Sequence, residues 1–201
     1  MGTLVLIRHG QSIWNAENRF TGWVDVGLSE KGIEEAKDAG RLLQDVQFDA
    51  VFASGLIRAQ RTADIILEKN KSWDGEQVRH DIRLNERNYG DLQGRNKQKC
   101  REQFGDEQVR LWRRSFDGKP PGGESLEMTA IRALPCLFEE IVPLLEVGKT
   151  VLVAAHGNSL RSLVMEIEGL SPEAIVEREI PTGTPMAYSL TSGVWSRLDL
   201  N

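Results

Sequence analysis

The sequence predicts an α/β protein in three layers, a mostly parallel sheet with helices on both faces. Short apolar runs of strand length alternate along the chain with longer segments in which apolar residues recur at helical spacing. Two of these runs, 4–7 and 151–155, end in turns that contain glycine. This alternation is typical of parallel strands joined by crossover helices.

In the first half of the chain, the strand 4–7 leads into a polar loop, 11–28. Ser29 is placed to cap a helix whose apolar positions are Ile33, Ala36, Gly40 and Leu43. Val51 and Phe52 mark a second buried strand. The next helix starts near Leu56, and its expected inward stripe is Leu56, Ala59, Ala63, Ile66 and Leu67. We expect 69–79 to be a surface connection and His80 to be solvated or capping.

The second half contains one more helix before a rigid and then flexible break at 119–123. Its expected inward face is Val109, Trp112 and Phe116. A long helix is expected over 124–145, kinked or interrupted by Pro135. The side chains expected to face inward from it are Met128, Ile131, Leu134, Phe138, Ile141 and Leu145. The strand 151–155, a helix 158–167 and two strands, 186–191 and 194–198, complete the pattern, with an antiparallel strand near the end.

Length and composition favour a single domain, 1–201, of ordinary globular character. The net charge is −5 at pH 7, so the chain lacks the basic field that general nucleic-acid or anionic-membrane binding requires. The first apolar run is too short for a signal peptide, and no run approaches the ~20 residues of a membrane span. We therefore expect a cytoplasmic protein. Cys100 and Cys136 stand far apart and are expected to be ordinary thiols.

Two of the three histidines follow the two apolar runs directly. His9 follows 4–7 with Arg8 beside it, and His156 follows 151–155. Ligands of open α/β sheets bind outside the carboxyl ends of the strands, and histidine is the side chain whose proton moves most easily near neutral pH. The paired imidazoles therefore indicate a catalytic site. The polar stretch 85–90 is expected to be a loop of that site.

The residues around these histidines resemble a known family. Residues 6–12 are similar to the arginine-histidine-glycine motif of the histidine phosphatase superfamily, and 155–158 are similar to the segment of its partner histidine. Within the superfamily, the ordered set resembles the cofactor-dependent phosphoglycerate mutases nearly from end to end. The segments that carry this resemblance are 21–23, 54–59, 84–87, 89–90, 106–109, 112–114 and 180–183.

The resemblance implies an isomerase that interconverts 3-phosphoglycerate and 2-phosphoglycerate in glycolysis and gluconeogenesis. His9 would accept and donate the phosphoryl group, primed by 2,3-bisphosphoglycerate as cofactor. A neutral imidazole can attack phosphorus without first losing a proton, and neighbouring arginines favour that neutral form. No metal is expected, because arginine and imidazole supply the positive charge. Small phosphoglycerates are the expected partners.

The remaining site residues are expected to fill four roles. Arg8 and Arg58 are expected to clamp the oxygens of the transferring phosphoryl group, with His156 as a further donor. Glu86 is expected to be the general acid and base, partly desolvated so that its pKa is useful. By resemblance, the phosphate or substrate also contacts Asn15, Thr21, Gly22, Gly157 and Asn158, while Tyr89, Lys97, Arg113 and Arg114 hold the carboxylate and the distal phosphate. Alone, Arg113 and Arg114 would also fit a solvated basic helix face.

The sequence departs from the mutase pattern in three places. Asn88 stands where these mutases usually carry histidine, 120–125 lacks the insertion of longer members, and no lysine-rich tail follows the last strand. Closure of the site is therefore expected from a loop, 97–105 or 120–123, or to be incomplete, with some leakage to bisphosphoglycerate phosphatase activity. A monomer or small homo-oligomer, at most a dimer, is expected.

Two alternatives compete with the mutase hypothesis. A broad-specificity histidine phosphatase would use water as the acceptor, and Arg113, Arg114 and the loop 85–87 count against it. A noncatalytic phospholigand-binding or scaffold protein would be expected to lack a catalytic residue, whereas His9, Glu86 and His156 are all present.

Overall fold

Six strands form one sheet at the centre of the computed structural model, which describes residues 1–75 and 77–200. In chain order the strands are β1 (Gly2–Arg8), β2 (Ala50–Ser54), β3 (Arg79–Asp81), β4 (Thr150–Ala155), β5 (Pro185–Thr191) and β6 (Val194–Leu198). Their order across the sheet is β3-β2-β4-β1-β5-β6. The first four run parallel, while β5 and β6 pair antiparallel. The predicted fold class is confirmed, including the antiparallel strands near the end.

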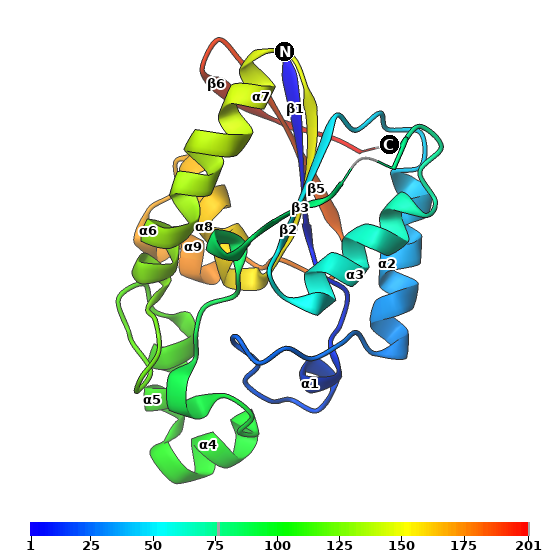
Figure 1. The fold of residues 1–201 in the computed structure, drawn as a ribbon. Helices are drawn as coiled ribbons and strands as arrows, with labels where there is room; N and C mark the ends of the chain where they lie inside the picture. The colour runs from blue at the N-terminus through cyan, green and yellow to red at the C-terminus, as the bar shows by residue number, and fades with distance from the viewer. Residues whose placement is uncertain (76, 201) are drawn as a thin grey trace.

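Helices cover both faces of this sheet (Figure 1). On one face lie α6 (Leu126–Cys136), α7 (Val142–Glu146), α8 (Gly157–Glu168) and α9 (Pro172–Glu177), and on the other lie α2 (Glu30–Leu42) and α3 (Ile57–Leu67). Side chains of a strand alternate between the faces, so Leu4 and Leu6 join the core under the first group and Val5 and Ile7 join the core under the second. Burial on both faces explains why these strands read as continuous apolar runs.

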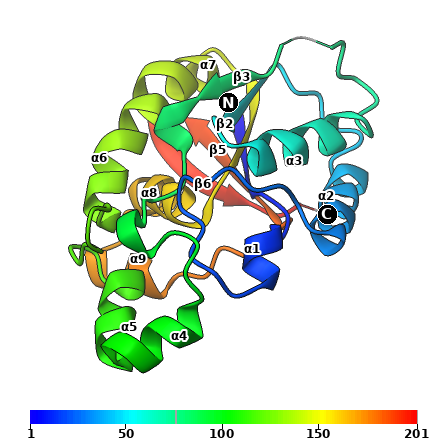
Figure 2. The same ribbon diagram turned by 60° about the horizontal axis from the view of Figure 1, so that its bottom comes forward.

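A smaller layer lies at the end of the sheet where the parallel strands finish, and it is brought forward in Figure 2. It contains α1 (Ile13–Ala16), α4 (Lys97–Phe104), α5 (Asp106–Arg114) and two single-turn 3-10 helices, η1 (Ile82–Leu84) and η2 (Gly90–Leu92). Its core is made by Phe20, Leu92, Cys100, Val109 and Trp112. This layer forms one wall of the cavity described below.

Residues 97–105, expected as a closing loop, are mostly the helix α4. Of its eight residues only Cys100 is buried, so the segment carries almost no apolar periodicity from which a helix could be predicted. Asn96 begins the helix by accepting hydrogen bonds from the amides of Gln98 and Lys99. The other expected closing segment, 120–123, is tied to η2, because the Asp91 amide donates to the Pro121 carbonyl.

The long helix expected over 124–145 is three segments, α6, a π-helical turn η3 (Leu137–Ile141) and α7. The predicted interruption is present, but α6 runs through Pro135 and the π turn begins two residues later, at Leu137. Pro135 and Pro143 each lack the N–H that a regular α-helix would use at that position.

The inward stripe predicted for this helix was partly wrong. Met128, Ile131 and Phe138 are 40%, 69% and 48% exposed. Ile141 and Leu145 are buried as predicted, and the other buried positions of α6 and the π turn are Leu126, Thr129, Ala130, Ala133, Cys136 and Leu137. The small residues Thr129, Ala130 and Ala133 permit close packing of α6 on α8, which turns the larger side chains outward.

Two smaller expectations also change. Phe116 does not lie on α5, which ends at Arg114, because Ser115 is extended and its hydroxyl donates to the Leu111 carbonyl. Phe116 packs instead against the core under α6 and α8. His80 is exposed as expected, but it lies in the edge strand β3 and not in a connection. Within the described residues, no helix has both the length and the apolar character to cross a membrane.

Candidate active site

His9 stands directly after β1, where the backbone fixes its ring. Its amide donates to the Ala155 carbonyl at 3.0 Å, and its Nδ1 lies 2.6 Å from the Gly10 carbonyl oxygen. A carbonyl can only accept, so Nδ1 carries the proton and Nε2 keeps its lone pair. Gly10 permits this turn because a Cβ there would lie 2.1 Å from the Gly32 carbonyl oxygen of α2. The free Nε2 is the atom a nucleophilic imidazole needs.

His156 packs beside His9, with the ring centroids 4.9 Å apart. It is fully buried, and its Nε2 shares a hydrogen bond of 2.7 Å with the Ser54 hydroxyl at the end of β2. Burial, followed by the charges of Arg58 and Arg8, holds the pKa of His9 well below its ordinary value. Burial and Arg58 do the same for the pKa of His156. Both imidazoles are therefore neutral at pH 7.

Arg58 and Arg8 flank the histidines and are held by backbone carbonyls. Arg58 of α3 is 1% exposed and donates to the carbonyls of Gly22 at 2.7 Å and Val24 at 3.1 Å. Burial lowers the pKa of Arg58 to about 10, so it remains charged at pH 7. Arg8 donates through Nη1 to the Ile180 carbonyl at 2.8 Å. These contacts fix two positive charges beside His9.

Glu86 lies across the cavity from these arginines, at the amino end of α8. Its Oε1 accepts from the Arg87 amide at 2.9 Å and from both the amide and the side-chain Nδ2 of Asn158 at 3.0 Å. Burial alone would raise the pKa of Glu86, but these hydrogen bonds and the charges of Arg8 and Arg58 outweigh it, so the pKa lies below its ordinary value. Glu86 is desolvated, as expected from the sequence, but its pKa is lowered overall, so Glu86 is ionised.

The end of the cavity remote from His9 carries Tyr89, Lys97, Arg113 and Arg114. The Tyr89 hydroxyl accepts from Arg87 Nη2 at 3.1 Å. Burial lowers the pKa of Lys97 and of Arg113, in each case with help from a neighbouring arginine. Arg114 pairs with Glu179 at 2.7 Å.

Asn15, Thr21 and Gly22 also line the cavity. Asn15 Oδ1 accepts from the Ser12 amide in the cap of α1, which leaves the Asn15 Nδ2 as a donor for the cavity. Gly22 has φ +57°, and a Cβ there would lie within contact of the Gln93 side chain.

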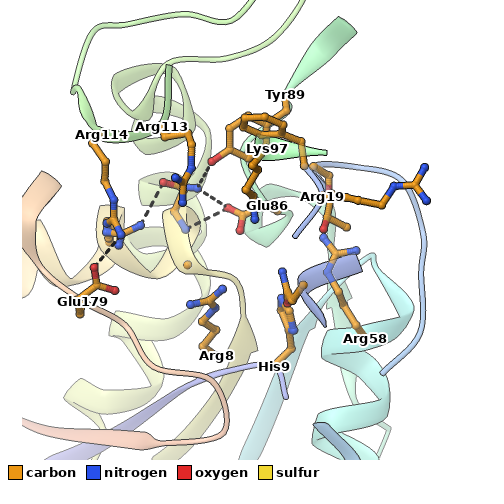
Figure 3. A pocket seen from close by; sticks show the side chains of 17 residues that line it. Arg8, His9, Arg19, Arg58, Glu86, Tyr89, Lys97, Arg113, Arg114 and Glu179 are labelled. Atoms are coloured by element: carbon orange, nitrogen blue, oxygen red, sulfur yellow. Dashed lines mark hydrogen bonds and ion pairs between the residues drawn. The ribbon is translucent and has the colours of Figure 1, made fainter. Parts of the chain in front are cut away.

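These residues enclose a cavity of about 160 Å³ (Figure 3). Thirteen of the fourteen site residues expected from the sequence line it, including Gly157, and His156 lies behind His9 outside the lining. Seven basic side chains face two acidic ones, although the whole chain is acidic. Such an excess of positive charge in a partly enclosed cavity binds anions with more than one charged group.

Four lining residues were missed from the sequence, namely Arg19, Phe20, Arg161 and Glu179. Arg161 stands three residues after Asn158 on α8, so helical spacing could have indicated it. Glu179 carries no such local signal, because tertiary packing alone brings the connection between α9 and β5 to the cavity. Asn88 does not line the cavity. It makes a turn in which its side chain accepts from the Gly90 amide, so its difference from the mutase pattern lies outside the site.

Within residues 1–75 and 77–200, no three histidine, cysteine or acidic side chains gather in a way that could hold a metal ion.

The chain is similar to known proteins over nearly its whole length. Residues 4–201 match the model of the histidine phosphatase superfamily (branch 1). A protein of Nitrobacter hamburgensis named 2,3-bisphosphoglycerate-dependent phosphoglycerate mutase is 55% identical over 98% of this chain and 97% of its own length. A protein of the same name from Nitrobacter winogradskyi is 56% identical with the same coverage.

Solved structures share the fold at lower identity. A mycobacterial glucosyl-3-phosphoglycerate phosphatase, solved with VO3, superimposes with a TM-score of 0.86 and 29% identity, covering 98% of this chain and 97% of that one. A putative alpha-ribazole-5'-P phosphatase from Escherichia coli gives a TM-score of 0.82 and 27% identity, covering 99% of this chain and 95% of that one.

Proposed function

We propose, from the premise that this chain belongs to the histidine phosphatase superfamily (branch 1), that it is a 2,3-bisphosphoglycerate-dependent phosphoglycerate mutase. The reaction is the interconversion of 3-phosphoglycerate and 2-phosphoglycerate. The two Nitrobacter relatives carry that name at 55–56% identity over nearly their whole length. We propose that residues 1–201 form a single domain, which is supported by a cavity lined from β1, α3, α5 and α8.

The observation that carries this proposal is that both ends of the cavity carry positively charged side chains. One end holds the neutral imidazole of His9 with Arg8 and Arg58, and the other holds Lys97, Arg113 and further cations. A phosphomonoester needs only the first end. A ligand with a second anionic group separated from the phosphate needs both, as phosphoglycerates do. The same donor set fits 2,3-bisphosphoglycerate, which when bound supplies the phosphoryl group that primes His9.

His9 and Glu86 divide the chemistry between them. His9 Nε2 carries the phosphoryl group and passes it to the free hydroxyl of the bound phosphoglycerate, forming a P–O bond as the P–N bond breaks. Glu86, ionised in the free site, accepts the proton of that hydroxyl. Glu86 returns the proton to the other ester oxygen when His9 takes up the second phosphoryl group. The negative charge of a bound phosphate raises the pKa of Glu86 and makes this return easier.

The other residues bind the negatively charged groups of the substrate during phosphoryl transfer. Arg8 and Arg58 stabilise the equatorial oxygens of the transferring group, with Asn15, Gly157 and Asn158 as further donors near them. His156, expected from the sequence to be a further donor, is not part of the cavity lining and packs against the His9 ring. Thr21 and Gly22 also contact the phosphate or the substrate. Tyr89, Lys97, Arg113 and Arg114 orient the carboxylate and the distal phosphate, so that either oxygen of the substrate can face His9.

A coupled assay tests this proposal. With 3-phosphoglycerate as substrate and enolase as the coupling enzyme, activity should depend on added 2,3-bisphosphoglycerate, while release of inorganic phosphate in the same mixture should be much slower. A broad-specificity phosphatase would release phosphate from the substrate faster than it isomerises it. That result would replace the mutase with the phosphatase.

We further propose a cytoplasmic enzyme that acts as a monomer or a dimer. Ile131 on α6, Phe138 in η3 and Ile82 in η1 are large exposed apolar side chains that a second copy would cover in the dimer. Light scattering after size exclusion gives the mass directly. A tetramer would contradict the proposal.

A further inference from the structure

Glu179 brings a carboxylate into a site built for anions. It lies in the connection between α9 and β5 and lines the cavity beside the remote cations. Its Oε1 accepts from Arg114 Nη2 at 2.7 Å (Figure 3). Arg114 Nη1 donates to the Val176 carbonyl of α9 at 3.5 Å. Arg114 is thus engaged by two groups of this part of the chain.

The position of Glu179 is set by backbone contacts on both of its sides. The carbonyl of Arg178 accepts from Arg161 Nε at 2.9 Å, and the carbonyl of Ile180 accepts from Arg8 Nη1 at 2.8 Å. Both of these arginines line the cavity. The side chain of Glu179 is 71% exposed, but its backbone is held at the wall of the site. The ion pair with Arg114 therefore differs from a casual contact between two mobile surface side chains.

The cations beside Arg114 have no such partner. Among the described residues, no carboxylate forms an ion pair with Arg113 or Lys97, although burial lowers the pKa of both. At the remote end of the cavity, an incoming anion therefore meets Lys97 and Arg113, which have no carboxylate partner among the described residues, and Arg114, which is paired with Glu179. An anion that uses Arg114 must displace Glu179 or bind next to its negative charge.

We propose that Glu179 is a specificity-determining residue that weakens binding in proportion to the negative charge at the remote end of the ligand. This inference rests on the proposed function, since it takes Arg114 as a substrate-binding residue. On the unphosphorylated enzyme, 3-phosphoglycerate can place its one phosphate at the His9 end, whereas 2,3-bisphosphoglycerate must place one of its two at the remote end, so Glu179 would penalise the bisphosphate more. The penalty favours release of the doubly phosphorylated species and limits how strongly it competes with substrate.

The expected effect follows from the charge involved. Losing an exposed ion pair of this kind changes binding by about two- to fivefold. Glu179→Gln should therefore bind 3-phosphoglycerate about two- to fivefold more tightly. The gain for 2,3-bisphosphoglycerate should be larger, because its second phosphate brings about 1.5 to 2 further negative charges. Both gains should shrink as salt is raised.

The test measures binding of 3-phosphoglycerate and 2,3-bisphosphoglycerate by calorimetry at fixed ionic strength in a His9→Ala background, which cannot take up the phosphoryl group, alone and combined with Glu179→Gln or Glu177→Gln. Glu177 ends α9, is exposed and does not line the cavity, so it controls for the loss of one negative charge nearby. An Arg114→Gln background completes a double-mutant cycle, in which Glu179→Gln should bring little or no gain.

Tighter binding in Glu179→Gln alone, larger for the bisphosphate and lost in the Arg114→Gln background, supports the proposal. Unchanged affinities, or equal gains in Glu177→Gln, would overturn it. The binding measurement needs no turnover. If the wild type binds both ligands without isomerising them, the proposed function fails while the role of Glu179 is still decided by the affinities.

Discussion

Replacing Glu86 by glutamine should remove proton transfer while leaving the geometry of the site in place. All three hydrogen bonds that Glu86 receives, from the Arg87 amide and from the amide and Nδ2 of Asn158, fall on the single oxygen Oε1. The carbonyl oxygen of glutamine can accept the same three, and its NH2 group then replaces the other carboxylate oxygen. The lost activity therefore measures the missing acid and base.

The magnitude follows from the role of the group. A positioned general acid and base contributes about 10²- to 10⁴-fold to the rate. At 1.36 kcal/mol for each factor of ten, this is about 2.7 to 5.4 kcal/mol of barrier. We expect the mutase kcat of Glu86→Gln to fall by that factor with little change in melting temperature.

An aryl phosphate separates this loss from damage to the site. Its phenolate leaves without being protonated, so the first transfer to His9 needs no acid. Rapid mixing of Glu86→Gln with p-nitrophenyl phosphate should give a stoichiometric burst of nitrophenolate within about tenfold of the wild-type rate. A variant that isomerises phosphoglycerate at nearly the wild-type rate, or one that loses the burst as completely as the mutase activity, would refute the reasoning.

Three further predictions follow from the charges of the site. His9 and His156 are held neutral, so below about pH 6.5 the unfolded chain binds protons at these histidines that the folded chain does not. In urea titrations, the free energy of unfolding should therefore decrease as the pH is lowered, by up to about 1.4 kcal/mol per pH unit for each histidine. A free energy of unfolding that stays constant between about pH 6.5 and 5 would contradict this. Arg113→Ala with Arg114→Ala should reduce mutase kcat/KM far more than hydrolysis of a small phosphate ester, and equal losses would indicate a folding role. EDTA should leave mutase activity unchanged, and loss restored by manganese would point to metal-dependent chemistry.

The parts of the fold that the sequence predicted are those in which one local pattern decides the outcome. The strands β1 and β4 are buried on both faces, so their apolar runs show where they end and which residues follow them. His9 and His156 could therefore be placed near each other, and their rings are 4.9 Å apart. The helix α2 was predicted together with its N-cap residue, Ser29, whose hydroxyl accepts a hydrogen bond from the Gly32 amide in the structure.

The parts that could not be predicted depend on contacts between distant segments. The helix α4 has one buried residue and hence no apolar stripe. Ile131 and Phe138 are apolar and helically spaced, but the π turn and the small residues of α6 turn them outward. Ser54 bonds to His156 across 102 residues of sequence, and Glu179 meets Arg114 across 65. No local sequence pattern predicts such pairs.

The central claim is that His9 carries the phosphoryl group, and intact mass spectrometry tests it most directly. After incubation with 2,3-bisphosphoglycerate, the wild-type chain should gain the mass of one phosphoryl group, which acid should remove because a phosphoramidate is acid-labile. His9→Ala should gain none and should show no mutase turnover. A His9→Ala chain that still takes up an acid-labile phosphoryl group would contradict the account and move the nucleophile elsewhere, with His156 the first residue to test.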